Sequence, residues 1–379
     1  MSHKTWLEDH PATDNKISVD IKDMLKEKGK TCISIILPTH RLGSDRQGDR
    51  LEIERAVLAA KHAVQYEPKL LVAINDLVEM IDFNHNKEGI GLFVSLNVTK
   101  LISFPFPVSK KIVIGKYFHL QDLLYTESYE EDYYVLDISQ KEIHLFHGVM
   151  DHLDEIRDDH FPQEIKDDYE YSRPDQSSSN SGYAHVKGFE KDKSILQQMR
   201  LKKVFHEMDK SLIKYMETKK IPLILCGSPK SIDLYRSVSG HSDNIIAVIS
   251  DNFRYKGIHD LEVFAWLQLQ SHVNTEKLKL IDGFKEKIGE GLGLYGIEET
   301  WQAAKEGRGL KLLVEKDYAR HAFISENKLY LDPPQESHAI IKDVISDIMN
   351  TVLDKKGKVM IVEKDELKDY DRIALITRY

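Results

Sequence analysis

The sequence has 379 residues, of which 41% are hydrophobic and 30% are charged, and its formal net charge is −9 at pH 7. This length allows two or three domains with ordinary cores, and the composition is that of a soluble globular protein. The negative charge argues against a protein that binds nucleic acid over its whole surface, because phosphate binding needs clustered Lys and Arg. Nucleic-acid binding would therefore be restricted to a local basic patch.

No apolar run reaches the roughly 18 residues that a membrane helix requires, and residues 1–17 lack the apolar stretch of a signal peptide. We therefore expect a cytoplasmic protein without a membrane partner. Cys32 and Cys226 each lie in an apolar, strand-like run, which favours buried free thiols over a disulfide or metal ligands.

The first part of the chain alternates short helices and strands, and we expect a first α/β domain at residues 1–128. Pro105 and Pro107 restrict the strand before them to a sheet edge or a strand end, because proline cannot donate to the ladder. The expected helices are 19–28, 51–64, 70–81 and a turn at 119–125, and the expected strands are 32–37, 89–94, 101–106 and 110–115.

A second domain is expected at residues 129–290, opening with the alternating strands 133–138 and 142–146, which a hairpin-sized connection joins, and a strand within 150–156. Further on, strand 221–226, helix 230–238 and strand 245–249 follow one another, which predicts parallel pairing. The predicted domain is a mixed sheet with helices.

Between these two groups of strands, residues 157–188 lose periodicity and include the low-complexity run 177–182. A loop of this length is either functional or disordered, and we expect it to be flexible. The helix after it, 190–218, has an apolar stripe for the core and lysines on its other faces.

A long helix, 258–288, leads to a third domain at 291–379, expected to be a compact α/β sandwich. Its last strand alternates Ile373, Leu375 and Tyr379 with smaller or polar residues, so we expect the end of the sequence to be built into a core. The remaining elements are helices 297–305 and 338–353 and strands 310–314, 321–325, 328–331 and 358–362.

Four motifs along the chain carry a resemblance to a known family. They are Leu37-Pro-Thr-His-Arg41, the hairpin from Tyr134 to Gly148, a helix ending at Gly307 before Leu310-Lys-Leu-Leu-Val314, and the closing run from Arg372 to Tyr379. In this order they resemble the bacterial archaeo-eukaryotic release factor-like family, which is related to Pelota and to class I peptide chain release factors.

The resemblance implies a three-domain α/β (α+β) fold, with a ribonuclease-H-like mixed sheet in the middle and a Pelota-type α/β sandwich at the end. It also implies a role in translation with the ribosome, tRNA or rRNA as partner, and no DNA. Release factors of the family hydrolyse peptidyl-tRNA through a Gly-Gly-Gln tip before a long helix. Residues 181–188, which correspond to that tip, contain no Gly-Gly-Gln, so we expect neither this reaction nor a cofactor or metal.

Three groups of residues are candidates for RNA contact, because arginine and lysine bind phosphate, glycines permit a tight loop, and a helix N-terminus attracts anions. His185 is a candidate for RNA contact or for acid–base work, although an exposed loop histidine is more often inert. Two alternatives stay open: a structural network between the arginines and the acids 49, 52 and 54, and a merely solvated lysine face. The candidates are Thr39, His40, Arg41, Arg46 and Arg50; Gly182, His185, Lys187 and Gly188; and Lys191, Lys193, Arg200 and Lys203.

Two other functions stay open. One is a metal-dependent hydrolase or nuclease acting on RNA or a phosphorylated small molecule, with Asp137 among its carboxylates. The other acids that follow, from 151 to 159, form a dense local run that is typical of a solvated loop. The second is a protein-interaction scaffold that binds its partner through the C-terminal domain.

Overall fold

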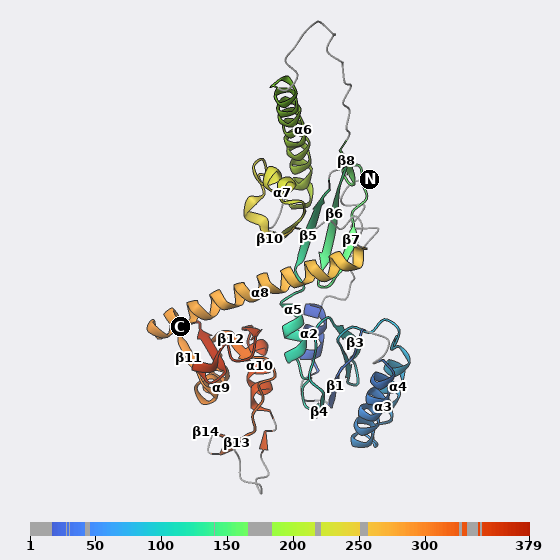
Figure 1. Cartoon of the computed structure of the whole chain (residues 1–379). Coiled ribbons are helices and arrows are strands. Elements are labelled where there is room, and N and C mark those ends of the chain that lie inside the picture. Colours follow the sequence, from blue (N-terminus) through green and yellow to red (C-terminus); the bar gives the residue numbers. More distant parts are fainter. Residues whose placement is uncertain are drawn as a thin grey trace. The chain divides into compact units, whose positions relative to one another are not determined.

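The computed structural model describes residues 17–27, 29, 31–41, 46–139, 141–165, 184–216, 221–250, 257–325, 328–331, 340–341 and 343–379, without the side chains of residues 46, 47, 184–194 and 340. It shows a mixed α/β protein, which confirms the predicted fold class (Figure 1). One compact unit is formed by residues between 14 and 130 together with 273–379, and the other by residues 131–272.

The first half of the larger unit contains a four-stranded sheet in the order β3-β2-β1-β4. β1 (Cys32–Pro38) is antiparallel to both β2 (Gly89–Val94) and β4 (Lys111–Gly115). β3 (Thr99–Phe104) pairs with β2 and lies at the edge of the sheet formed by the described strands, as the prolines beside it predict. The helices of this half are α2 (Ile17–Leu25), α3 (Arg46–Ala63), α4 (Pro68–Glu79) and α5 (Gln121–Glu127).

Helices α3 and α4 cover one face of this sheet. Ile53 and Val57 of α3 and Ile74 of α4 are buried in one cluster with Ile33 and Ile35 of β1. Most of the apolar positions that predicted α3 face the core, but Leu51 and Leu58 do not, because they are 55% and 69% exposed.

The second half of the larger unit contains a sheet in the order β11-β17-β12-β16 and a small sheet in the order β14-β13-β15. β12 is parallel to β16, and β17 is antiparallel to both β11 and β12. The strands are β11 (Gly293–Tyr295), β12 (Gly309–Glu315), β13 (Ala322–Ser325), β14 (Lys328–Leu331), β15 (Ile340–Ile341), β16 (Lys358–Val362) and β17 (Ile373–Thr377). The helices are α9 (Ile297–Glu306), α10 (Val344–Asp354) and the 3₁₀ turn η3 (Lys368–Tyr370).

Two expectations for this half need correction. The last strand is built into the core, because Ile373 and Leu375 are 0% exposed, but it ends at Thr377 and leaves Tyr379 72% exposed. Helix α10 begins at Val344 and not at 338, because Asp343 caps it by accepting a hydrogen bond from the Ile345 amide at 3.1 Å.

The two halves of the larger unit share polar contacts that the sequence did not predict. The Lys111 amine lies 2.8 Å from Asp122 and 2.7 Å from Asp317. Gln121 donates to the carbonyl of Glu315 at 3.1 Å. Segments assigned to the first and third predicted domains thus pack into one unit, and the three-domain division stays a prediction.

The smaller unit is built on the sheet order β10-β9-β5-β6-β7, with β8 paired to β6. Central β5 is antiparallel to β6 and parallel to β9, and β9 is parallel to β10, which confirms the parallel pairing predicted for the strand–helix–strand pattern. The strands are β5 (Asp132–Ile138), β6 (Glu142–Val149), β7 (His152–Glu155), β8 (Gln163–Glu164), β9 (Leu223–Gly227) and β10 (Ile245–Ile249). The helices are α6 (Ala184–Met216), α7 (Pro229–Arg236) and the 3₁₀ turn η1 (Ser242–Asn244).

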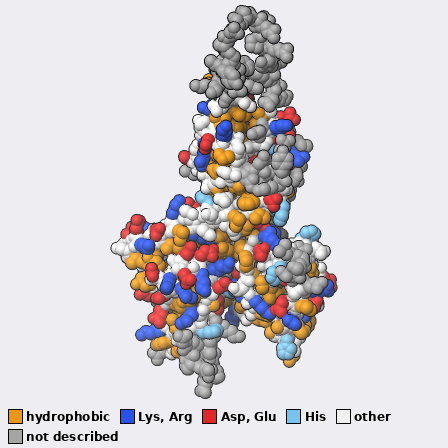
Figure 2. Space-filling view, in the orientation of Figure 1, with side chains coloured by type: hydrophobic (Ala, Val, Ile, Leu, Met, Phe, Trp, Pro, Cys, Tyr) orange, Lys and Arg blue, Asp and Glu red, His pale blue; other side chains and the backbone are white. Residues whose placement is uncertain are grey.

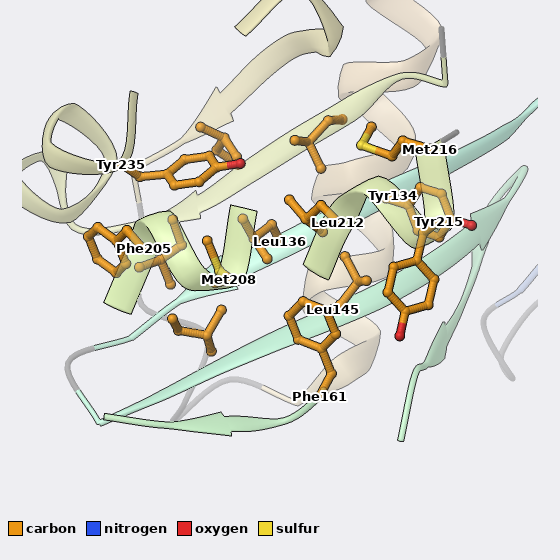
Figure 3. Close-up of a cluster of buried hydrophobic side chains, with 14 of the residues drawn as sticks. Tyr134, Leu136, Leu145, Phe161, Phe205, Met208, Leu212, Tyr215, Met216 and Tyr235 are labelled. Atoms are coloured by element: carbon orange, nitrogen blue, oxygen red, sulfur yellow. The ribbon is translucent and has the colours of Figure 1, made fainter. Parts of the chain in front are cut away.

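Helix α6 packs its C-terminal half on this sheet (Figure 3). Phe205, Met208 and Leu212 lie against Leu136 of β5 and Leu145 of β6 in a fully buried cluster. The helix begins at 184, six residues earlier than expected, and β8 lies within the segment expected to be a loop.

Helix α8 (Ile258–Gly289) continues along the sequence from the smaller unit into the larger one. Cys32 and Cys226 are both buried and are not joined in a disulfide, as predicted. Within the described residues, none of the helices combines the length and apolar character that crossing a bilayer requires.

Candidate functional site

The segment after β1 contains three of the predicted RNA-contact residues, and two of them are tied into the fold. The Thr39 side chain, 2% exposed, donates to the carbonyl of Lys87 at 2.8 Å. Arg41 donates from Nε to Glu88 at 2.9 Å and from Nη2 to the carbonyl of Pro105 at 3.3 Å. These bonds connect the end of β1 to the segments that flank β2 and β3, so a structural role accounts for both side chains.

His40 is different, because its side chain is 53% exposed while a buried carboxylate holds it. Asp49, 3% exposed in the first turn of α3, accepts from the His40 backbone amide at 2.8 Å and lies 2.7 Å from the ring Nδ1. A carboxylate at Nδ1 fixes the tautomer and the orientation of an imidazole. Asp49 therefore orients an imidazole that is about half exposed to solvent.

The arginines of α3 follow the structural alternative. Arg50 pairs with Glu54 at 3.1 Å, and Arg55 pairs with Glu52 at 2.9 Å. Both arginine side chains are about 70% exposed, so each pair contributes little to stability and leaves a charge that solvent can reach. The backbone of Arg46 belongs to α3, and its side chain lies outside the described residues.

The second and third predicted groups fall on or beside α6. Gly182 lies outside the described residues. Five other candidates belong to the helix, but the structure describes only their backbone: His185, Lys187, Gly188, Lys191 and Lys193. Positions 185–188 are therefore helical and not a loop. Arg200 and Lys203 are both exposed, and Lys203 lies 4.0 Å from Glu207.

Acidic and basic side chains are interspersed over most of the face drawn in Figure 2. No single-sign field covers that face, so contact with a polyanion would depend on local clusters. The described part of α6 offers such exposed cations, with Ile195 and Met199 exposed beside them at 42% and 63%.

Asp137, the carboxylate of the hydrolase alternative, is 8% exposed and is the second-to-last residue of β5. It pairs in register with His144 of β6 and Cys226 of β9. Burial raises its pKa to about 6, against a smaller lowering by His144. Among the residues that the structure describes, no three or more His, Cys, Asp or Glu side chains are arranged to hold a metal ion.

A buried lysine that the sequence analysis missed lies where the two halves of the larger unit meet. Lys277 of α8 is 2% exposed, and its Nζ has no hydrogen-bond partner among the described residues. The amine lies 4.5 Å from the ring centroid of Tyr125 and 4.7 Å from that of Tyr129. Burial lowers its pKa to about 8, although Glu363 and Glu366 act in the opposite direction. Its position on the apolar face of α8, four residues before Ile281, was the available signal.

A second missed group is the carboxylate of Asp209 on α6, 6% exposed. It accepts from the Tyr235 hydroxyl and the Ser239 hydroxyl at 2.7 Å each, and from the Gly240 amide at 2.8 Å. His241 Nδ1 lies 3.0 Å away. The hydrogen bonds outweigh burial and lower the pKa of Asp209, so this residue fixes the turn after α7 to α6.

Comparison with known proteins agrees with the resemblance predicted from the sequence. Residues 132–308 match the sequence model of bacterial archaeo-eukaryotic release factor family 3, so the predicted resemblance is confirmed over that segment. No curated protein matches the sequence.

Solved structures of translation factors resemble the chain at low identity. Archaeoglobus fulgidus Pelota is 17% identical, with 77% of this chain and 79% of that chain covered and a TM-score of 0.40. S. cerevisiae Dom34, described as a translation termination-like factor that interacts with Hbs1, is 14% identical, with 77% and 74% covered and a TM-score of 0.37. The archaeal termination factor aRF1 is 12% identical, with 96% and 97% covered and a TM-score of 0.25.

Proposed function

We propose that this protein is a ribosome- or tRNA-associated factor of the release-factor and Pelota type, which acts in translation rescue or ribosome regulation. The observation that carries the proposal is the family match over residues 132–308. The sequence has no Gly-Gly-Gln, so the proposed factor binds without hydrolysing peptidyl-tRNA.

Two described features support contact with RNA. His40 presents a half-exposed imidazole that the buried Asp49 orients, and Arg200 and Lys203 are exposed on α6. Both features place groups that bind phosphate at the surface of their units.

Co-sedimentation with ribosomes at low and high salt tests the proposal. The wild-type protein is expected in the ribosomal fractions at low salt and to be released as salt rises, because phosphate contacts release counterions. The H40A and R200Q/K203Q variants should be released at lower salt, whereas the matched control K279Q/K285Q, which changes exposed lysines of α8, should behave as wild type. Absence of the wild type from every ribosomal fraction at low salt would remove the proposal.

The second candidate, a hydrolase acting on RNA or a phosphorylated small molecule, is favoured by one observation, the buried Asp137 with its raised pKa. Its test is cleavage of labelled RNA with added Mg²⁺ by the wild type and by D137N. Cleavage that D137N abolishes would support it, and no cleavage by the wild type would exclude this substrate.

A further inference from the structure

The topology of the β11-β17-β12-β16 sheet brings three chain segments to one of its ends. β12 and β16 are parallel neighbours, and each directly follows a helix, α9 or α10, so both strands start where those helices end. β17 is antiparallel to β12 and pairs Thr377 with Gly309, so residue 378 reaches the same end of the sheet.

These segments, 305–311, 354–358 and 378, are rich in cations. Their acids are Glu306 and Asp354. Seven cations of these segments are accessible or half-accessible, and we call six of them the basic edge: Arg308, Lys311, Lys355, Lys356, Lys358 and Arg378.

Hydrogen bonds to backbone carbonyls hold the basic edge together. Arg378 donates from Nη1 to the carbonyl of Gly307 at 3.0 Å and from Nη2 to that of Lys355 at 2.8 Å, which joins the C-terminal ends of α9 and α10. Lys355 donates from Nζ to the carbonyl of Lys305. Carbonyls at helix C-termini attract cations, and because these acceptors carry no net charge, they leave the positive charges in place.

The electrostatics of the basic edge are unfavourable in the protein by itself. Lys311 and Lys358 are direct register partners on neighbouring strands, and like charges in that position are destabilising. Burial and the charge of Lys358 both lower the pKa of Lys311.

Carboxylates do little to relieve this repulsion. Arg308 forms an ion pair with Glu306 at 3.5 Å. Among the described residues, no carboxylate forms an ion pair with Lys311, Lys356 or Lys358. Glu127 of α5 interacts with Lys358 at longer range. A chain with a net charge of −9 therefore keeps a cluster of repelling cations at one end of a sheet.

We propose that the basic edge binds the phosphate backbone of RNA. Tyr379, directly after Arg378, is 72% exposed and supplies an aromatic face on which a base can stack. Stacking beside cations favours RNA over an acidic protein surface, which would use the cations alone. This inference rests on the proposed function and deepens it, because it names a surface through which the factor would contact rRNA or tRNA.

The test measures the affinity of the full chain for a fluorescent single-stranded oligouridine of about 20 nucleotides, long enough to span a binding groove. We expect K311Q/K356Q/K358Q to lose about tenfold or more in affinity at low salt and to reduce the slope of log K against log salt by about 2. The control K26Q/K279Q/K285Q removes the same charge from exposed, ion-paired lysines and should bind as wild type. The first variant should melt no earlier than wild type, since it removes the repulsion between Lys311 and Lys358.

Each other outcome is decisive. Equal RNA binding by the two triple variants would overturn the inference. It would also be overturned if polyglutamate bound the wild type as tightly as the RNA does and if K311Q/K356Q/K358Q weakened both interactions equally, since the partner would then be an acidic protein. Ribosome co-sedimentation that this variant leaves unchanged would contradict the basic edge while the proposed function stands. A third outcome is that K311Q/K356Q/K358Q loses RNA binding while the wild type is absent from ribosomal fractions. This result would support the basic edge as an RNA-binding surface and would remove the proposed function.

Discussion

Replacement of Lys277 by methionine tests whether burial between the two halves of the larger unit lowers the pKa of this lysine. The amine is buried between two tyrosine rings without a hydrogen-bond partner among the described residues, and its folded-state pKa of about 8 lies below its usual value of 10.5. Methionine has a similar length and no charge, so it keeps the packing and removes only the titration.

The direction of the pH effect follows from proton binding. Between pH 8 and pH 10.5 the unfolded chain binds the Lys277 proton more tightly than the folded protein does, so stability rises with pH in that window. A difference of about 2.5 pKa units corresponds to about 3 kcal/mol in total, of which about 1.4 kcal/mol is expected between pH 7 and pH 9.

Urea denaturation of the wild type and K277M at pH 7, 8 and 9 measures this contribution. The free energy of unfolding of the wild type should rise relative to that of K277M by about 1.4 kcal/mol over this range, since all other titrating groups are common to both proteins. K279M, which changes a side chain that is 66% exposed two residues along the same helix, should follow the wild type at every pH. A constant difference between wild type and K277M from pH 7 to pH 9 would refute the reasoning.

Three further changes test other parts of the structure. D137N should stabilise the protein relative to wild type by about 2 kcal/mol more at pH 7 than at pH 4. The reason is that the pKa of Asp137 is raised to about 6 in the folded protein, so the wild type loses the stabilising protonation of this residue as pH rises from 3.8 through about 6. Urea denaturation measures the difference, and equal differences between the two proteins at both pH values would contradict the prediction. D209A should cost about 3 kcal/mol in urea denaturation, because it leaves the buried Tyr235 hydroxyl and the Gly240 amide without their acceptor, and a cost under about 0.5 kcal/mol would disprove the role of Asp209. D49A should cost about 1–2 kcal/mol and broaden the His40 ring signals in NMR spectra, since the carboxylate holds both the ring and the backbone amide; an unchanged His40 environment would show that the contact does not form in solution.

Local pattern predicted much of the secondary structure. The strand 89–94 has the bounds predicted for it, and the edge position of β3 followed from Pro105 and Pro107. Parallel pairing of β9 with β10 followed from the helix between them. These features depend on neighbouring residues, whose periodicity and backbone preferences a sequence displays directly.

The sequence did not predict where helix α10 begins or where strand β17 ends. The Asp343 cap starts α10 later than its apolar residues suggested, and Tyr379 lies outside a strand that ends at Thr377. Of the predicted RNA-contact residues, Thr39 and Arg41 turned out to be held by partners about 47 to 64 residues away, which no spacing rule reveals.

The sequence alone determined which family the chain resembles, where most helices and strands lie, and that both cysteines are buried. Only the tertiary structure decided that residues between 14 and 130 form one unit with residues 273–379, that Lys277 is enclosed by Tyr125 and Tyr129, and that six cations from three segments share one end of a sheet. The physical reason is the distance along the chain: a lysine reads the same in a sequence whether it points to water or lies between two rings, and its environment is set by segments more than a hundred residues away.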